Sequence, residues 1–249
     1  MTGTYKNMEV FGGITLINAD CMEVMRTIPD KAFDLAIVDP PYGIGADKPS
    51  AKPNTVRQKN GTILKVQSIN YKHKDWDSNT PKKEYFDLLK RVSKEQIIWG
   101  VNYFHYNLQG GRIVWDKLNG MSDQFDCEIA YNSINNRTDI VYYMWAGMFQ
   151  GIYCGKDVRK AIVQQGNKSL NEKRIHPTQK PVELYKWILS NYANPGDKIL
   201  DTHLGSGSIC IACDDLGFEM TGIELDQDYY RSARQRLINH QAQQKLFLR

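Results

Sequence analysis

The segment from Lys198 to Glu224 constrains the fold more than any other stretch of the sequence. An apolar strand pattern ends at Asp201, a turn contains Gly205 and Gly207, an apolar helix pattern follows, and a second strand pattern ends at Glu224. This succession is typical of a β-α-β unit with two parallel strands. The glycines let the backbone pass close to a ligand, and the final acid is placed to accept hydrogen bonds from ribose hydroxyls. The segment therefore predicts a nucleoside-binding site.

Two other interpretations of this glycine turn stay open. A dinucleotide site fits less well, because the third glycine position of G-x-G-x-x-G holds Cys210. A lone G-x-G also occurs in ordinary β-to-α turns that bind nothing. The acids Asp201 and Glu224 at the two strand ends favour the nucleoside site over the plain turn.

A second strand pattern, from Phe33 to Val38, is apolar enough to be buried on both faces of a parallel sheet. It is followed by Asp39-Pro40-Pro41-Tyr42. Prolines lack a backbone donor and have a fixed φ, so they end the strand and leave the acid and the tyrosine on a stiff turn. We expect right-handed crossovers to place this strand beside the one that ends at Asp201, so that both turns share one crevice.

Together with the later run His176-Pro177-Thr178-Gln179-Lys180-Pro181, these motifs resemble those of the amino-methyltransferases of DNA. Those enzymes use S-adenosyl-L-methionine to methylate adenine N6 or cytosine N4. The catalytic motif precedes the cofactor motif, which is similar to the β group of the family, and the resemblance covers nearly the whole chain. It implies an α/β, Rossmann-like methyltransferase fold with a circularly permuted motif order and a mostly parallel central sheet that carries inserted loops.

The resemblance also implies roles for single residues. It assigns catalysis to Asp39, Pro40, Pro41 and Tyr42. It implies cofactor contacts from Asp20 near the adenine, from Thr178 and Lys180 at the methionine end, and from a wider set: Asp39, Asp201, His203, Gly205, Ser206, Gly207, Glu224 and Leu225. His203 stands where the family commonly has an aromatic residue. Helix capping is a sufficient explanation of Asp20, and helix entry of the Thr178–Lys180 stretch.

The predicted reaction is methylation of adenine N6 in a base that has left the duplex. Methylation of cytosine C5 would need a nucleophilic thiol, and no Pro-Cys pair occurs in the chain. By resemblance, Asp39 favours adenine, because cytosine N4 enzymes often have Ser at that place. An N4-cytosine enzyme is the nearest alternative. An RNA or protein-glutamine methyltransferase and a catalytically inactive nucleic-acid-binding relative are further ones.

The charge of the chain is unevenly distributed. Residues 43–80 carry seven Lys/Arg against three Asp/Glu, and residues 156–180 carry seven against two, whereas the net charge of the whole chain is only +4. Two basic segments on an otherwise acidic body suit a polyanion, and solvated loops are the alternative. The expected partner is double-stranded DNA, and the expected contacts are Lys48, Lys52, Arg57, Lys59, Lys72, Arg159, Lys160, Lys168 and Arg174.

We expect one methyltransferase domain over residues 1–249. A loop over about 43–80 is expected to be mobile without DNA and to close over the extruded base, because long loops beside a catalytic turn are usually functional. By resemblance, a segment over about 119–175 recognises the target sequence. Family members occur as monomers and as dimers, so a homodimer is possible.

Hydrophobic periodicity and capping residues predict the remaining elements. Strands are expected over 13–18, 96–100, 112–116 and 139–145, and helices over 22–28, from Pro81, from Val182 and over 227–237. Asp20, Thr80 and Asp226 are the expected N-caps, 126–129 is expected to be a helix or turn, and the last dozen residues are expected to fray. Asn102, Tyr103, Asp116 and Lys117 follow strands and are candidates for the base pocket, although core or turn roles explain each one singly.

The cysteines and the apolar runs bear on the cellular environment. Five cysteines without paired spacing predict reduced thiols, and Cys210 and Cys213 suit core packing better than zinc, so no metal is expected. The sequence has no run of about eighteen apolar residues and no apolar core near Met1, which predicts neither a membrane span nor a signal peptide. A cytoplasmic location is expected.

Overall fold

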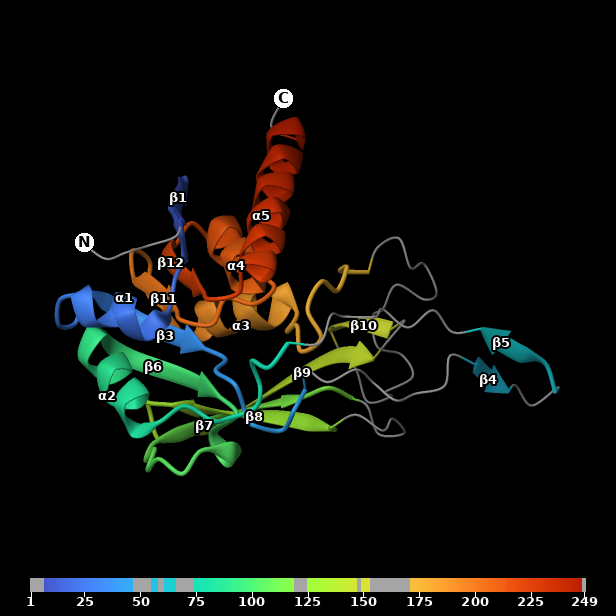
Figure 1. Ribbon diagram of the computed structural model, residues 1–249, viewed down its shortest axis with the longest axis horizontal. Coiled ribbons are helices and arrows are strands. Elements are labelled where there is room, and N and C mark those ends of the chain that lie inside the picture. The colour runs from blue at the N-terminus through green and yellow to red at the C-terminus, as the bar shows by residue number, and fades with distance from the viewer. Residues whose placement is uncertain are drawn as a thin grey trace.

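A ten-stranded sheet forms the centre of the chain, with helices on both of its faces (Figure 1). The computed structural model describes residues 7–46, 55–57, 61–65, 74–118, 125–146, 149–152 and 171–247. The strand order in the sheet is β1-β2-β12-β11-β3-β6-β8-β7-β9-β10. Within it, β1, β8 and β10 pair antiparallel with their neighbours, and the other pairings are parallel. The predicted mostly parallel α/β class is therefore confirmed.

The strands of the sheet are β1 (Asn7–Phe11), β2 (Ile14–Asn18), β3 (Phe33–Val38), β6 (Ser93–Trp99), β7 (Gly111–Asp116), β8 (Cys127–Asn132), β9 (Thr138–Ala146), β10 (Phe149–Ile152), β11 (Lys198–Asp201) and β12 (Glu219–Glu224). The predicted neighbours β3 and β11 do pair, in parallel, although more than 150 residues lie between them. Leu35 to Val38 of β3 are at most 1% exposed, as expected for a strand covered on both faces.

Two hydrophobic cores lie on opposite faces of the sheet. Helices α1 (Cys21–Thr27) and α2 (Lys83–Val92) cover one face together with a short 3₁₀ turn η1 (Val101–Tyr103). Helices α3 (Val182–Tyr192), α4 (Ser208–Leu216) and α5 (Gln227–Phe247) cover the other. Consecutive residues of the central strands alternate between these cores: Leu35 and Ile37 face one, and Ala36 and Val38 face the other.

Two of the expected helix caps are present and one is not. The carboxylate of Asp20 accepts the backbone N–H of Met22 at 2.7 Å, and that of Asp226 accepts the N–H groups of Asp228 and Tyr229. The prediction that Thr80 caps a helix starting at Pro81 is wrong, because α2 begins at Lys83 after Lys82. Thr80 instead packs against the turn at Gly43, where its backbone N and Cγ2 leave only 3.2 Å for an added Cβ.

Pairing between distant strands overrides other local predictions. Residues 126–129, expected to be a helix or turn, belong mostly to strand β8, which pairs with both β6 and β7. Strand β1 pairs with β2 at the edge of the sheet and had no clear sequence signal. The expected fraying after Leu237 is also wrong, since α5 continues to Phe247. Gln241 donates to Asp214 of α4 at 2.7 Å and so holds this extension on the body.

The long loop expected over 43–80 contains secondary structure of its own. Strands β4 (Thr55–Arg57) and β5 (Ile63–Lys65) form an antiparallel hairpin outside the main sheet (Figure 1). Farther along, Asp77 is 1% exposed and lies against the turn that follows β3. Among the described residues, no helix has both the length and the apolar character needed to cross a membrane.

Candidate active site

Two adjoining cavities open where the parallel strands have their carboxyl ends. The larger, about 640 Å³, lies over the ends of β2, β11 and β12. The smaller, about 270 Å³, lies over the ends of β3 and β7 and over the start of β8, which reaches the same edge because it runs in the opposite direction. Asp39, Trp76 and Lys180 line both cavities, so they form part of the wall between them.

Most of the residues expected to bind the cofactor line the larger cavity: Asp20, Asp39, Thr178, Lys180, His203, Gly205, Ser206, Glu224 and Leu225. Asp201 and Gly207 lie behind it. Asp201 accepts the backbone N–H of His203 at 2.9 Å, and its burial raises the pKa of the carboxyl to about 8. At Gly207 an added Cβ would lie 3.0 Å from the Cβ of Ala233, so the glycine lets α5 approach the turn.

Glu224 joins the glycine turn to the end of β12. One carboxylate oxygen accepts the backbone N–H of Gly205 and the other that of Asp226, both at 2.8 Å. Burial raises the pKa of Glu224 to about 7 although these two bonds oppose the change. Each oxygen keeps a second lone pair, and the side chain lines the cavity. The site thus offers a fixed carboxylate to a ligand with paired hydroxyls.

Two histidines in the larger cavity are held neutral by burial. The pKa of His203 is lowered to about 4 and that of His176 to about 3. His203 exchanges a hydrogen bond of 2.9 Å with the hydroxyl of Thr202, and His176 packs between the rings of Trp76 and Tyr229 at centroid distances of 5.1 and 4.3 Å. The cavity therefore has an aromatic wall suited to a flat, uncharged ring.

Asp39 and Tyr42 face each other across the turn after β3. The phenol of Tyr42 donates to one oxygen of Asp39 at 2.5 Å, and the ammonium of Lys180 donates to the other at 2.5 Å. The ring of Tyr42 stacks on Tyr103, with 5.0 Å between centroids and 13° between planes. Its other neighbour is Gly100, where any Cβ would overlap the ring at 2.1 Å. The side chain of Tyr42 is thus confined on two sides.

The backbone of the same turn is held by Asp77. One carboxylate oxygen accepts the N–H groups of Tyr42 and Gly43 at 2.7 and 2.8 Å, and the other accepts that of Ala46 at 2.7 Å. Because Pro40 and Pro41 have no N–H groups, the N–H groups of Tyr42 and Gly43 are the first backbone donors after Asp39. Asp77 holds both of them, and that of Ala46, around one buried carboxyl group.

Comparison with known proteins decides the family. A family model described as DNA methylase matches residues 33–235, from strand β3 into helix α5. The chain belongs to the DNA methylase family. The resemblance seen in the catalytic, His176–Pro181 and glycine motifs is therefore confirmed, and this protein is a DNA methyltransferase.

Individual relatives agree with this assignment. The chain is 24% identical over 247 residues to the type II methyltransferase M.HpaI of Haemophilus parainfluenzae, and the match covers 89% of this chain and 73% of the relative. It is 25% identical over 236 residues to the putative methylase YubD of Escherichia coli K12, covering 89% and 88%. A crystal structure of an M1.HpyAVI–SAM complex shares its fold, with a TM-score of 0.51 and 22% identity over 90% of this chain and 100% of that one.

Most of the residues of this chain that were expected to contact DNA lie outside the described residues: Lys48, Lys52, Lys59, Lys72, Arg159, Lys160 and Lys168. Of Arg57 only the backbone, in β4, is described. Arg174 is described and lines the smaller cavity. Its guanidinium lies 4.5 Å from the ring centre of Trp145 and donates to the backbone oxygen of the same residue at 2.8 Å, so it forms part of the pocket wall.

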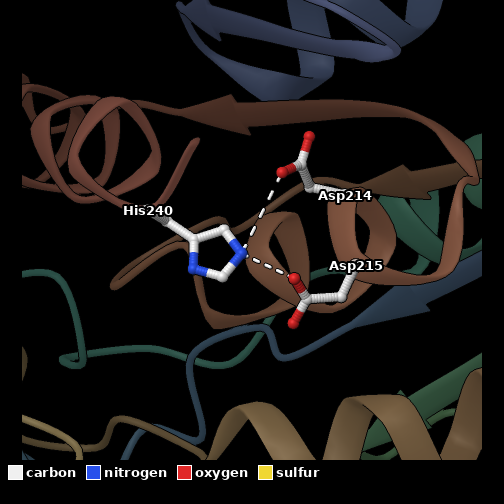
Figure 2. Close-up of side chains that lie close together, drawn as sticks. All are labelled: Asp214, Asp215 and His240. Atoms are coloured by element: carbon white, nitrogen blue, oxygen red, sulfur yellow. Dashed lines mark hydrogen bonds and ion pairs between the residues drawn. The ribbon is translucent and has the colours of Figure 1, made fainter. Parts of the chain in front are cut away.

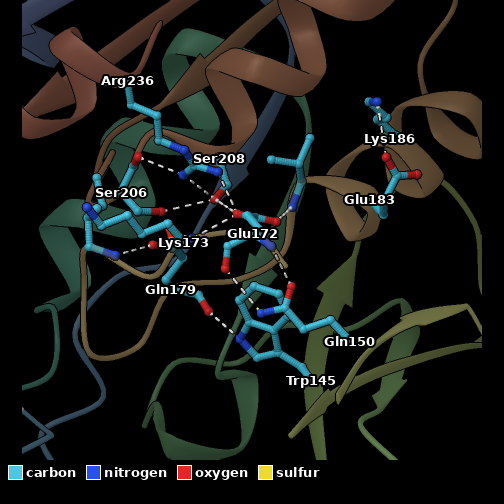
Figure 3. Close-up of polar contacts among 12 residues, drawn as sticks. Trp145, Gln150, Glu172, Lys173, Gln179, Glu183, Lys186, Ser206, Ser208 and Arg236 are labelled. Carbon is cyan, nitrogen blue, oxygen red and sulfur yellow. Dashed lines mark hydrogen bonds and ion pairs between the residues drawn. The ribbon is translucent and has the colours of Figure 1, made fainter. Parts of the chain in front are cut away.

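A polar network around Glu172 anchors the chain just before the His176–Pro181 motif (Figure 3). Glu172 accepts from Arg236 of α5 at 2.5 Å, from Gln179 at 2.8 Å and from the backbone N–H of Val182 at 3.0 Å. Its own backbone exchanges two hydrogen bonds with the amide of Gln150 in β10. The His176–Pro181 motif is thus fastened both to the far edge of the sheet and to α5.

A second cluster, Asp214, Asp215 and His240, joins α4 to α5 away from both cavities (Figure 2). His240 Nε2 lies 2.6 Å from a carboxylate oxygen of Asp215 and 4.0 Å from one of Asp214. Lys186 of α3 already places an ammonium 2.8 Å from the other oxygen of Asp215. The cluster therefore serves as a polar network that links three helices.

The structure adds two functional candidates that sequence reasoning missed. Glu128 in β8 lines the smaller cavity and pairs with Lys117 at 2.5 Å and with Lys180 at 2.9 Å. Asp77 holds the catalytic turn as described above. Tyr103 and Lys117, two of the four candidates for the base pocket, do line the smaller cavity. No local pattern marks Glu128 or Asp77, since each acquires its partners only through the fold.

Proposed function

We propose that this DNA methyltransferase transfers a methyl group from S-adenosyl-L-methionine to N6 of an adenine that is flipped out of double-stranded DNA. One observation carries the proposal. The carboxylate of Asp39, 18% exposed, lies in the wall between a large cavity with a ribose-type acceptor and a smaller cavity with aromatic walls. An acceptor at that boundary is where an amine must sit to meet a methyl donor.

The residues of the larger cavity fit the cofactor. Glu224 is the acceptor for the ribose hydroxyls, Asp20 and His203 are placed for the adenine, and Gly205 leaves the backbone accessible to the ligand. The neutral state of His203 suits a flat aromatic base. When bound, the cofactor supplies an electrophilic methyl group on a sulfonium. The chain needs to contribute only position and hydrogen bonds, because no covalent enzyme intermediate is required.

The residues of the turn prepare the amine. The nitrogen of an exocyclic amino group is a poor nucleophile, because its lone pair is delocalised into the ring. Asp39 and the carbonyl of Pro40 accept its two hydrogens and draw the nitrogen toward a tetrahedral shape, which exposes the lone pair. Asp39 then takes the proton that the methylated nitrogen releases. Tyr42 contributes a stacking surface for the base.

The choice of adenine rests on the Asp at position 39 and on the family resemblance. The alternative, cytosine N4, uses the same turn and the same amine chemistry, and the smaller cavity of about 270 Å³ admits either base. The same proposal includes four further parts. One methyltransferase domain extends over the whole chain, and its two basic segments contact the DNA. The 43–80 loop closes over the base, and residues 119–175 recognise the target sequence.

The test is to incubate the protein with unmethylated DNA and S-adenosyl-L-methionine, digest the DNA to nucleosides and analyse them by mass spectrometry. N6-methyladenine is expected. N4-methylcytosine alone would transfer the assignment to the other base, and a cofactor-binding protein that modifies neither base in any DNA would overturn the proposal.

Asp39→Ala is the matched inactive variant. It is expected to lower transfer by at least about a thousandfold, since it removes the acceptor for the amine, and to bind cofactor nearly as well as the wild type. Asp30→Ala, which removes an exposed acid before β3, serves as the control and is expected to remain active. Retention of most activity by Asp39→Ala would remove this carboxylate from the mechanism.

A further inference from the structure

We propose that Lys180 is a positioning residue for the carboxylate of Asp39, held in that role by Glu128, rather than a ligand of the cofactor's carboxylate. The proposal rests on the function proposed above, in which Asp39 accepts the target amine. It departs from the role that the family resemblance implies for Lys180, and it adds Glu128 to the residues that govern the reaction.

The first observation is that the ammonium of Lys180 has no donor left for another ligand. Its nitrogen lies 2.5 Å from Asp39 Oδ2, 2.9 Å from Glu128 Oε2 and 3.1 Å from the hydroxyl of Tyr42. An ammonium has three hydrogens, and three acceptors surround it. The side chain is 2% exposed, so water does not compete for these bonds.

The second observation is that the partners are themselves fixed. Glu128 accepts from Lys117 at 2.5 Å through its other oxygen, and Asp39 accepts from Tyr42 through its other oxygen. The nitrogen of Lys180 also lies 5.2 Å from the ring centre of Trp99 and 5.5 Å from that of Tyr42. The two lysines and two acids alternate along one chain of contacts, from Lys117 through Glu128 and Lys180 to Asp39.

The third observation concerns the ionisation of Asp39. Burial and the negative charge of Glu128 raise the pKa of this carboxyl, while Lys180 and the hydroxyl of Tyr42 oppose the rise. Burial would lower the pKa of Lys180, but Asp39 and Glu128 outweigh it and raise that pKa. The pKa of Glu128 falls to about 2, because Lys180 and Lys117 together outweigh the effect of burial. Lys180 is thus the cation that keeps the amine acceptor charged.

Among the described residues, other titratable groups act on Asp39 from the elements around it. They are Tyr42 in the same turn, Lys180 just before α3, Tyr185 in α3, Glu128 from β8, Asp201 from β11 and Tyr85 from α2. Lys117, after β7, reaches this group through its ion pair with Glu128. The pKa values of the three tyrosines are raised by burial, so they stay neutral. The two lysines are the cations of this group.

A consequence for the reaction follows from the sign of these effects. Activity requires Asp39 as a carboxylate, so it is lost as pH falls through the pKa of Asp39. Removing Lys180 raises that pKa further, so the acidic limb of the rate profile must move to higher pH. An opposite charge at this distance typically changes a pKa by about one to three units. Glu128 has the opposite effect, because its negative charge raises the pKa of Asp39. Removing that charge should therefore move the acidic limb to lower pH, while the ammonium of Lys180 loses one of its acceptors.

The experiment measures kcat against pH at saturating S-adenosyl-L-methionine, and the dissociation constant of the cofactor by calorimetry, for Lys180→Met, Glu128→Gln and wild type. Lys180→Met is expected to lower kcat at pH 7 by about a hundredfold and to move the acidic limb up by about one unit or more. Glu128→Gln should move it in the opposite direction, to lower pH, because it removes a negative charge that raises the pKa of Asp39. Lys186→Met, which removes an ion-paired lysine of α3 far from the cavities, should behave as wild type.

The cofactor measurement separates the two roles of Lys180. The proposal predicts that Lys180→Met changes the dissociation constant by less than about threefold. A rise of about tenfold or more, with kcat and its pH profile intact at saturating cofactor, would assign Lys180 to the cofactor and overturn the proposal. An unmoved acidic limb in both variants would do the same. If Lys180→Met fails to fold, the isosteric Glu128→Gln carries the test: it should lower kcat, because Lys180 loses an acceptor, and leave the cofactor dissociation constant unchanged. An unchanged kcat, or about tenfold weaker binding of the cofactor, would then overturn the proposal.

Failure of this inference is distinguishable from failure of the proposed function. The wild type is analysed by mass spectrometry with the same DNA in the same experiment. A wild type that methylates no base sinks the proposed function. A wild type that methylates DNA, with variants that keep its pH profile, sinks only the role of Lys180.

Discussion

At the scale of single residues, Glu224 makes the cofactor cavity sensitive to pH. It is buried, accepts two backbone N–H groups and has a pKa of about 7, so its charge changes within the range in which the protein is assayed. The ionised form is the better acceptor for ribose hydroxyls. Cofactor affinity therefore depends on the protonation state of Glu224, which lies outside the catalytic turn.

We predict that cofactor binding tightens as pH rises from 6 to about 8, because a raised pKa means that Glu224 carries a proton below about 7. Glu224→Gln should bind about tenfold more weakly at high pH and show a flatter pH dependence, since it loses the charged acceptor. Calorimetry at several pH values measures both. Glu219→Gln, at the exposed start of β12, is the control, and parallel curves for the wild type and Glu224→Gln would contradict the prediction.

A second prediction concerns Gly100, which leaves space for the ring of Tyr42. Gly100→Ala should reduce kcat by at least about tenfold, because its Cβ would occupy the position of the ring. The substitution also strains the backbone, since φ is 74°. Gly217→Ala is the matched control: φ is 75° there and nothing lies within 4 Å, so it should cost about 1 kcal/mol of stability and leave kcat unchanged. Equal activity losses in both variants would attribute the effect to strain alone.

At the scale of elements, the stretch from Lys74 to Asp77 joins the two cavities. Lys74 pairs with Asp226 at the start of α5 at 2.5 Å, Trp76 lines both cavities, and Asp77 holds the backbone of the catalytic turn. One short stretch thus contacts the cofactor side, the boundary and the base side in succession.

We predict that Asp77→Asn releases the turn without emptying the cofactor cavity. The amide lacks the charge that binds three N–H groups, and its NH₂ cannot accept, so stability should fall by about 1–3 kcal/mol. kcat should fall with it, while the cofactor dissociation constant changes little. Thermal unfolding and calorimetry measure the two effects. An unaltered kcat in a destabilised variant would mean that the turn keeps its shape without Asp77. Glu23→Gln, which changes an exposed acid of α1, is the control.

Elements whose own side chains determine them were predictable from the sequence. The run Leu35 to Val38, the glycine turn at Gly205 and the helix after Pro181 each have a local pattern, and each is found where expected. Strand β8 has no such pattern. It pairs with β6 along one side and with β7 along the other, and these pairings bring Glu128 to the site.

The same distinction applies to the candidate site. Asp39 and Glu224 were foreseeable because each stands at the end of a strand that the sequence reveals. The partners of Lys180 were not, since Asp39 lies 141 positions away and Glu128 comes from the unpredicted strand. A motif therefore locates the reacting groups, whereas the groups that set their charge are distributed over the whole chain.

At the scale of the whole molecule, the distribution of charge predicts how DNA is bound. The basic excess falls in residues 43–80, which follow the catalytic turn directly, and in residues 156–180, which run into the His176–Pro181 motif. Phosphate contacts release counterions, so the affinity of such a protein for duplex DNA falls steeply with salt.

We predict that replacing Lys48 and Lys52 with Gln lowers the slope of log affinity against log salt by about 2, with no change in cofactor affinity. Lys94 and Lys198 provide a control of equal charge. They are exposed and lie at the amino ends of β6 and β11, opposite to the strand ends that carry the cavities. Their replacement should leave the slope as it is. Fluorescence anisotropy with a labelled duplex over a salt series measures it, and equal slopes for both pairs would mean that only total charge matters.

The order of strands in the sheet has a consequence for synthesis of the chain. Strands β2 and β3 are made early and consecutively, yet β12 and β11, made last, lie between them. Until β11 and β12 leave the ribosome, β2 and β3 each lack one of the neighbours that they pair with in the folded sheet, and both are apolar strands. The nascent chain has no complete methylation site until β11 and β12 are inserted, so it cannot methylate DNA before that step. Aggregation is most probable in the interval before their insertion.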